Sequence, residues 1–436
     1  MKIAFVTLGC KVNLCETQGL MQLALERGDE IVERDADAVI VNSCAVTAIS
    51  ERKNMRAIHK ARKENPVAII AVMGCMAQTN PDKLLADGTA DLICGVQNRI
   101  SVLEACEAAL TKRNEEKMIP ACRAIRQEFE VLSAGVPRGR TRALLKIEDG
   151  CNNFCSYCII PYARGRVRSL PVEKALEEAV RLAAAGIQEI VLTGIEIASY
   201  GQDLSPRISL VELVETLCRK CSGVRFRLGS LEPRLITEEF CKTLSHLLNL
   251  APHFHLSLQS GCDGVLKRMN RKYTCAVFEE AVKRLRQAFP DCSITADVIV
   301  GFPGETEEEF ETTCNFLEKI GFSDVHVFPY SIRPGTKAAQ LSNQIEEAVK
   351  KQRADRVREL AEQLSLRYRT RFIGKTLTIL PEHLVEKQVW AAHSAYAFPV
   401  YVKDTALQKN VPAAVVLTGI ERDGIAAQRI SKDCEE

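Results

Sequence analysis

The chain has 436 residues, of which 46% are hydrophobic and 26% are charged, fractions that exclude collagen, coiled coil and wholesale disorder. Its 58 Lys and Arg residues against 56 Asp and Glu residues give a formal net charge of +2, so any nucleic-acid site must be a local cluster of cations. A chain of this length predicts about two to four domains.

Cysteine is the unusual component, with 18 residues. The N-terminal apolar run is short and lacks a signal-peptide cleavage pattern, so we expect it to be a first strand. Because no apolar stretch is long enough to span a bilayer, we expect no membrane partner and a cytoplasmic location. In that reducing compartment, clustered thiols serve metals or redox chemistry more often than disulfides.

The N-terminal part alternates β-branched runs with amphipathic segments. The runs predict strands at residues 2–8, 38–43, 67–73 and 90–94. This alternation indicates an α/β domain with an open parallel sheet over residues 1–115. Residues 116–136 are polar and contain Pro and Gly, which predicts a linker.

The central part repeats the alternation on a longer scale. Strands are predicted at residues 143–147, 189–193, 225–229, 253–258, 294–300 and 325–328, with helices at 172–185, 210–220, 276–288 and 307–320. Repeated βα units indicate a partial (β/α)6 barrel over residues 137–369, with its chemistry at the carboxyl ends of the strands.

A charged helix at residues 344–368 leads to the C-terminal part, residues 370–436. Strands are predicted there at residues 376–380, 397–402 and 413–417, without a helix between them. This pattern indicates a small β-barrel.

Three cysteines follow the first barrel strand with C-x3-C-x2-C spacing, namely Cys151, Cys155 and Cys158. Three thiolates on one loop can bind three irons of a four-iron cluster and leave the fourth iron open. A zinc site would prefer four ligands, and no matching Cys or His pair lies nearby in the sequence. The spacing therefore favours an iron-sulfur cluster over zinc or chance.

A second set consists of Cys10, Cys44 and Cys75, each of which directly follows a predicted strand. Parallel strands end at the same edge of a sheet, where ligands of open α/β folds bind. A second three-cysteine cluster is therefore geometrically plausible. The alternative is three small buried residues at strand ends, a common place for Cys.

The C-x3-C-x-aromatic-C motif, with Tyr157 as its aromatic residue, resembles the signature of radical S-adenosylmethionine (SAM) enzymes. The resemblance implies that the open iron binds the amino and carboxylate groups of SAM. It also implies that an electron from a reducing donor cleaves SAM to a 5′-deoxyadenosyl radical. The protein positions the cofactor and excludes water from it.

The whole chain resembles the methylthiotransferases, which carry an N-terminal domain, a radical SAM barrel and a C-terminal TRAM domain. The resemblance rests on TLGCKVN, NSCAVT and GCMAQ, and on further segments such as IVLTGIEIASYGQD, HLSLQSGCDGVLKRMNRKYT and DVIVGFPGETEEEF. Within that family, TLGCKVN and NSCAVT most resemble the branch that modifies N6-threonylcarbamoyladenosine in tRNA, next to the anticodon.

This resemblance implies two 4Fe-4S clusters, one on each cysteine set, and two SAM molecules per turnover. One SAM methylates a sulfur at the N-terminal cluster, and the radical from the other activates adenine C2 for methylthio insertion. Relatives modify N6-isopentenyladenosine in tRNA or a ribosomal-protein aspartate, and a non-catalytic iron-sulfur RNA-binding protein is a further alternative. The sulfur source stays open, and Cys15 departs from the expected pattern.

Further cofactor contacts are implied by the same resemblance, at Tyr157, Glu196, Gly301, Phe302 and Pro303. Glycines at the end of the strand in VIVGFPGET let a backbone approach a ligand closely. The alternative is an ordinary strand-to-helix turn with a capping box. A lone Glu196 would more often be a solvated surface charge.

Two cation-rich segments, residues 138–168 and 350–375, are predicted to bind tRNA phosphates without reading sequence. The candidate contacts are Arg164, Arg166, Arg168, Arg367, Arg369, Arg371 and Lys375. For the second segment the alternative is a solvated helix face. The β-barrel predicted to follow it resembles the RNA-binding TRAM domain, and this resemblance favours tRNA.

Overall fold

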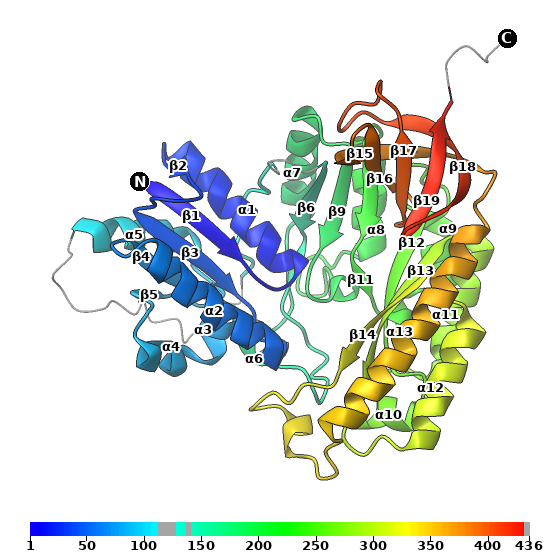
Figure 1. The fold of residues 1–436 in the computed structure, drawn as a ribbon, viewed down its shortest axis with the longest axis horizontal. Helices are drawn as coiled ribbons and strands as arrows, with labels where there is room; N and C mark the ends of the chain where they lie inside the picture. The colour runs from blue at the N-terminus through cyan, green and yellow to red at the C-terminus, as the bar shows by residue number, and fades with distance from the viewer. Residues whose placement is uncertain (112–127, 137–140, 431–436) are drawn as a thin grey trace.

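A computed structural model of the protein describes residues 1–111, 128–136 and 141–430. Figure 1 shows three parts: an N-terminal α/β unit, a central set of parallel strands with helices outside them, and a small C-terminal β-barrel. The C-terminal barrel lies beside the amino ends of the central strands, because Arg142 at the start of one strand bonds to Glu382 and His393.

The N-terminal unit is a parallel five-stranded sheet in the order β2-β1-β3-β4-β5. Its strands are β1 (Lys2–Thr7), β2 (Glu30–Ile31), β3 (Ala38–Ser43), β4 (Ile69–Gly74) and β5 (Leu92–Ile93). Its helices are α1 (Lys11–Glu26), α2 (Ala48–Glu64), α3 (Cys75–Thr79), α4 (Pro81–Asp87) and α5 (Ile100–Thr111). All four predicted strands are present, and the short β2 is an addition at the edge.

The central unit is a partial barrel of parallel strands in chain order, as predicted. The strands are β6 (Arg142–Lys146), β9 (Glu189–Thr193), β10 (Arg225–Leu228) with its continuation β11 (Ser230–Leu231), β12 (His253–Gln259), β13 (Ser293–Val300) and β14 (Asp324–Pro329). Gly229 interrupts the third strand. The hairpin of β7 (Glu148–Asp149) and β8 (Arg168–Ser169) brackets the loop with the C-x3-C-x2-C motif.

Helices cover the outer face of these strands (Figure 1). They are α7 (Val172–Ala184), α8 (Leu210–Lys220), α9 (Glu238–Leu244), α10 (Asp263–Arg268), α11 (Cys275–Ala288), α12 (Glu307–Ile320) and α13 (Glu347–Thr370), with 3-10 turns η1 (Ile197–Ser199), η2 (Pro233–Leu235) and η3 (Lys337–Gln340). The short α6 (Ile160–Arg164) instead packs against α3 of the N-terminal unit. Among the described residues, no helix combines the length and apolarity needed to cross a membrane.

Alternation along the strands divides the barrel into an apolar outside and a polar interior. Even-numbered residues of β12 and β13, such as Phe254 and Ala296, join the main hydrophobic core under the helices. The odd-numbered side chains point the other way, and His253, His255 and Thr295 line an interior cavity. A polar interior favours a barrel that holds a ligand over one filled with side chains.

Part of the predicted linker is packed rather than free. Residues 116–127 lie outside the described residues, but residues 128–136 run between the first two units. Ala134 is buried in the barrel core, and a Cβ on Gly135 would lie 2.2 Å from the Gln18 carbonyl oxygen. The partners of this segment belong to two other parts of the chain, so its local sequence pattern did not predict the packing.

The C-terminal unit is a closed barrel in the order β15-β16-β17-β19-β18. The strands are β15 (Thr376–Glu386), β16 (Val389–Ser394), β17 (Pro399–Lys403), β18 (Ala413–Glu421) and β19 (Gly424–Arg429). The sequence predicts β15, β17 and β18 but not β16 and β19. Their alanine pairs have low strand propensity, and partners across the barrel compensate for it.

Phe372 is the residue that joins α13 to this barrel. It is fully buried, with its ring centroid 5.1 Å from that of Tyr368, 4.8 Å from Tyr396 and 4.9 Å from Phe398. The cavity left by Phe372→Ala should lower the free energy of unfolding of the C-terminal barrel by about 3–5 kcal/mol. Urea unfolding followed by the fluorescence of the single tryptophan, Trp390 in β16, measures it.

The neighbouring Ile373 is 42% exposed and provides the matched control. Ile373→Ala should change the same free energy of unfolding by less than about 0.5 kcal/mol. Equal losses in the two variants would contradict the role given to Phe372.

Candidate functional site

Cys10, Cys44 and Cys75 lie at one edge of the N-terminal sheet. Cys10 caps α1, Cys44 follows β3, and Cys75 begins α3 after β4. Gly9 has a φ of +104°, and a Cβ there would lie 2.8 Å from the Cys44 Cβ. The missing side chain therefore lets the loop after β1 approach Cys44 closely.

The electrostatics agree that these thiols share one site. Burial raises the pKa of Cys75 to about 11, the Arg164 guanidinium opposes the shift, and the thiols of Cys10 and Cys44 add to it. Arg164 Nε donates to the Cys75 sulfur at 3.2 Å. This donor favours a thiolate, the form that binds metals.

The loop with Cys151, Cys155 and Cys158 is held in place by backbone contacts. Gly150, at φ +85°, has its Cβ position 2.0 Å from the Arg166 carbonyl oxygen, so no side chain fits there. The Cys151 amide donates to the Gly165 carbonyl at 3.0 Å. From the other side, Asn270 Nδ2 donates to the Phe154 carbonyl at 2.9 Å. The loop is therefore positioned before any ligand binds.

Two nitrogen donors reach the sulfurs of this loop. Arg271 Nη1 lies 3.2 Å from the Cys155 sulfur, and the Asn153 amide lies 3.4 Å from the Cys151 sulfur. Hydrogen bonds to coordinating sulfurs tune iron-sulfur clusters. Sequence analysis missed Arg271, because nothing in RMNRKYT distinguishes it from a surface cation.

The two cysteine sets face each other. Cys75 and Cys151 belong to one hydrophobic cluster, and Cys158 packs against it. Burial raises the pKa of Cys158 to about 12, to which Cys155 and then Cys75 contribute. Strand ends from two separate sheets thus bring six thiols to one place.

Four of the predicted cofactor residues lie on two segments: Tyr157 on the cysteine loop, and Gly301, Phe302 and Pro303 directly after β13. Tyr157 packs on the small cluster that contains the fully buried Phe302, so the cysteine loop and the end of β13 are in contact. Gly301 has a φ of +70°, and its Cβ position is 2.4 Å from Lys350 Cγ. The close approach at Gly301 is therefore to α13, while the adjacent Pro303 is buried.

Glu196 is buried, which makes the alternative of a solvated surface charge wrong. Asn153 Nδ2 lies 3.4 Å from its Oε2, and its Oε1 is buried without a partner among the described residues. Burial raises the pKa of Glu196 to about 7, which Arg271 partly opposes and Glu232 reinforces. A carboxylate with one unsatisfied oxygen beside the cysteine loop can accept a bond from a cationic ligand.

Two predicted RNA contacts are corrected by the structure. Arg164 is fully buried and donates from Nη1 to Glu16 at 2.8 Å and to Asp149 at 3.0 Å. Arg168 is 3% exposed and lies 3.3 Å from Asp149. Neither guanidinium can reach RNA, because buried carboxylates far away in the sequence draw both inward. Arg166 is exposed and lies over the Phe154 ring, and Arg138 and Arg140 fall outside the described residues.

For the second cation-rich segment, residues 350–375, the predicted RNA contact is wrong at one position. Arg369 is buried and donates to the Gly424 carbonyl at 3.2 Å, so it joins α13 to the C-terminal barrel. Arg367 is exposed. Arg371 and Lys375 are partly exposed and both pair with Asp291, at 2.8 and 2.5 Å.

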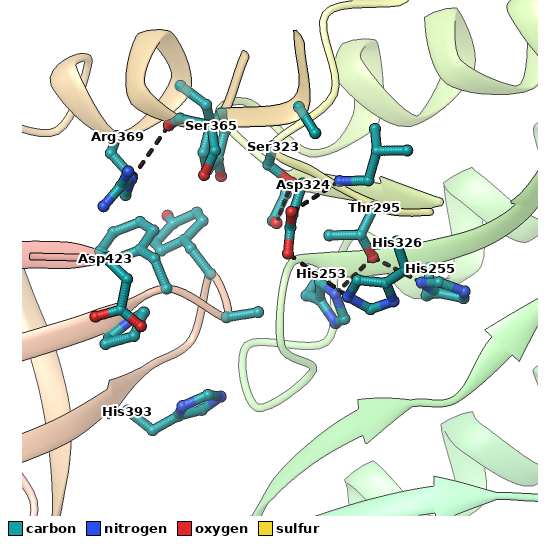
Figure 2. Close-up of a pocket in the computed structure, with 18 of the residues that line it drawn as sticks. His253, His255, Thr295, Ser323, Asp324, His326, Ser365, Arg369, His393 and Asp423 are labelled. Atoms are coloured by element: carbon teal, nitrogen blue, oxygen red, sulfur yellow. Dashed lines mark hydrogen bonds and ion pairs between the residues drawn. The ribbon is translucent and has the colours of Figure 1, made fainter. Parts of the chain in front are cut away.

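Two cavities open between the units. One, of about 1250 Å³, is lined by Cys10, Cys44, residues of α2 and the end of β14. The other, of about 600 Å³, lies between the central barrel and the C-terminal barrel. Figure 2 shows His253, His255 and His326 on the strands of the central barrel, with His393 and Asp423 opposite them.

Glu196 makes the stability of the iron-free protein pH-dependent. Its pKa rises from 4.5 in the unfolded chain to about 7 in the fold, so between these values only the folded state holds the proton. Stability therefore falls as the pH rises through this window, by up to about 3 kcal/mol. Glu196→Gln should raise the melting temperature at pH 8 and leave it nearly unchanged at pH 4.5; equal shifts at both pH values would refute this assignment.

Arg164 should contribute to stability and not to RNA affinity. Arg164→Leu leaves Glu16 and Asp149 buried with fewer cations, which should lower the free energy of unfolding by about 3–5 kcal/mol. The exposed neighbour Arg166, changed to Leu, should cost less than about 0.5 kcal/mol. Denaturant unfolding followed by circular dichroism compares them, and a near-neutral Arg164 variant would contradict the network.

Comparisons with known proteins agree with this geometry. Residues 145–317 match the Radical SAM superfamily, and residues 2–95 match Uncharacterized protein family UPF0004. The structure of the radical SAM methyltransferase TsrM from Kitasatospora setae covers 78% of this chain and 75% of its own, with a TM-score of 0.55 and 16% identity. That likeness concerns the fold alone.

Relatives of known activity align over most of the chain. Threonylcarbamoyladenosine tRNA methylthiotransferase MtaB of Bacillus subtilis is 41% identical over 87% of this chain and 84% of its own. MtaB of Thermotoga maritima is 39% identical over 97% and 96%. A tRNA-2-methylthio-N(6)-dimethylallyladenosine synthase of Fusobacterium nucleatum is 34% identical over 87% and 88%. With both cysteine sets in place, the chain belongs to the radical SAM methylthiotransferase family.

Proposed function

We propose that this enzyme inserts a methylthio group at C2 of N6-threonylcarbamoyladenosine in tRNA, beside the anticodon, with two 4Fe-4S clusters. The observation that carries the proposal is the meeting of two three-cysteine sets across one hydrophobic cluster. Relatives named for this substrate reach 41% identity, against 34% for one named for dimethylallyladenosine. This difference favours the threonylcarbamoyl branch.

The residues present fit the two clusters. Each set offers three thiols, which would bind three irons of a four-iron cluster and leave the fourth iron open to a small molecule. At the N-terminal set, Gly9 keeps the space beside Cys44 free of a side chain. At the loop set, the unpartnered Oε1 of Glu196 is an acceptor for the amino group of SAM.

When bound, the loop cluster supplies the electron that cleaves SAM, and the N-terminal cluster holds the sulfur to be transferred. The protein residues orient and shield these groups. Arg271 and Arg164 donate to the sulfurs of Cys155 and Cys75 and so stabilise their thiolates. Tyr157 and Phe302 close the apolar side of the site against water. A reducing donor supplies the electron.

The units have separate roles in this proposal. Residues 1–115 hold the sulfur-carrying cluster, and residues 116–136 connect this unit to the central barrel. Residues 137–369 cleave SAM, and residues 370–436 bind tRNA. Of the predicted RNA contacts, Arg166, Arg367, Arg371 and Lys375 are accessible to phosphates. Contacts of this kind position the RNA without reading its sequence.

Single cysteine variants separate the two clusters. Cys155→Ala should abolish both 5′-deoxyadenosine formation and 2-methylthio product, because it removes SAM cleavage. Cys75→Ala should retain 5′-deoxyadenosine formation and lose the product, because it removes the sulfur carrier. Anaerobic assays with dithionite and chromatography measure the first, and nucleoside mass spectrometry of tRNA measures the second.

The control is Cys106→Ala, at a buried helix position in the N-terminal unit. It should retain both products and both clusters. If wild-type enzyme produces 2-methylthio-N6-isopentenyladenosine instead, the substrate assignment is wrong; if tRNA is unchanged, the substrate is not tRNA.

A further inference from the structure

The two cavities are lined by neighbouring residues of the same elements, and together they are called the groove. On β14, Asp324 and His326 line the smaller cavity and Phe328 lines the larger. These residues point to the same face of one strand at intervals of about 6–7 Å, so the cavities lie end to end along it. At the junction, Cys10 lines the larger cavity and Lys11 lines the smaller. The groove therefore runs directly from the N-terminal cysteine set to the side chain of Lys11.

Lys11 is the cation of the smaller cavity that is not engaged by a neighbour. Its ammonium has no hydrogen-bond or ion-pair partner within residues 1–111, 128–136 and 141–430. Its side chain is exposed, and Arg142 and Arg227 line the same cavity. An unpaired ammonium in such surroundings favours an anionic partner.

The neighbouring cations are already engaged. Arg227 forms a bidentate ion pair with Glu189, in which Nε lies 2.8 Å from Oε1 and Nη2 lies 3.2 Å from Oε2. It also donates to two carbonyl oxygens of the C-terminal barrel. Arg142 donates from Nε to Glu382 at 3.0 Å and lies 2.9 Å from His393 Nε2 through Nη1. Its Nη2 has no partner within the described ranges. Lys11 and the second nitrogen of Arg142 are thus the free donors.

The histidines deeper in the groove do not compete for an anion. His255 Nε2 lies 3.4 Å from Asp297 Oδ2, and His326 Nδ1 lies 3.3 Å from Asp297 Oδ1. His326 also lies 3.5 Å from Asp324 (Figure 2). These pairs neutralise one another, so among the described residues Lys11 carries the unpaired positive charge of the smaller cavity. The larger cavity has cations of its own on α2 that the described part of the chain leaves unpaired, namely Arg52, Lys53 and Arg56.

We propose that Lys11, with Arg142, binds the carboxylate of the threonylcarbamoyl group of the substrate nucleoside. This inference rests on the proposed function. Adenine C2 and the N6 substituent flank N1 on the same edge of the base, so a C2 atom presented to the sulfur carrier brings the substituent close to it. Lys11 follows cluster ligand Cys10 directly in the chain. Within the smaller cavity, the carboxylate then meets the free donors of Lys11 and Arg142.

The test compares anticodon stem-loop RNAs with the reconstituted holoenzyme. One RNA carries N6-threonylcarbamoyladenosine, a second carries its neutral methyl ester, and a third carries unmodified adenosine. Because a charged hydrogen bond is lost, wild-type enzyme should bind the ester RNA about 10- to 100-fold more weakly. Lys11→Gln should bind the acid and the ester RNA equally, and Lys11→Arg should restore most of the preference.

The matched control is Lys60→Gln, at a position on α2 whose side chain is 71% exposed. It should keep the full preference, and all variants should keep wild-type iron content and uncoupled 5′-deoxyadenosine formation. If Lys11→Gln weakens all three RNAs equally, Lys11 binds an RNA phosphate and the proposal is overturned. If wild-type enzyme methylthiolates none of the RNAs, the proposed function fails instead, whatever the affinities show.

Discussion

A buried network of charges holds the two cysteine sets in place. Glu16 of α1 and Asp149 of the barrel hairpin, both inaccessible to solvent, are surrounded by the cations Arg99, Lys146 and Arg164. Burial opposes ionisation of Glu16, but Arg164, Arg99 and Lys146 together lower its pKa to about 2. Two carboxylates from different units cannot stay charged in the interior unless their shared cations stay with them. The relative position of the N-terminal sheet and the barrel is therefore tied to this network.

The network connects directly to the chemistry. Arg164 lies on α6, immediately after the cysteine loop, and reaches both Glu16 and the sulfur of Cys75. One guanidinium thus connects the loop of one cysteine set, a ligand position of the other and the helix that begins beside Cys10. A buried ion pair is weak evidence for stability, but it does specify geometry when each partner has one satisfactory arrangement. We expect the distance between the two cysteine sets to depend on that arrangement.

The interior of the central barrel is open and polar, in contrast to the closely packed charge network. Its histidines and carboxylates pair with one another, and its apolar residues face the helices. The N-terminal unit and the C-terminal barrel close this interior at different places, which leaves a groove between all three units. A flipped-out nucleoside needs such a space, since its base must leave the RNA stack to reach a reactive atom. The same three-way junction explains why Lys11, from the first unit, lies beside Arg142 of the second.

The sequence by itself determined the local features. These are the six barrel strands, the placement of the two candidate cysteine sets after strand ends, and the resemblance carried by short motifs. These follow from periodicity and spacing, which are properties of neighbouring residues. Only the tertiary structure decided the roles of Arg164, Arg168 and Arg369. Whether a guanidinium contacts RNA or forms a buried ion pair or hydrogen bond depends on carboxylates and carbonyl groups far away in the chain. The burial of Glu196 and the free ammonium of Lys11 belong to the same class. Charge can be read from sequence, whereas its partners and its solvent exposure are set by packing between units.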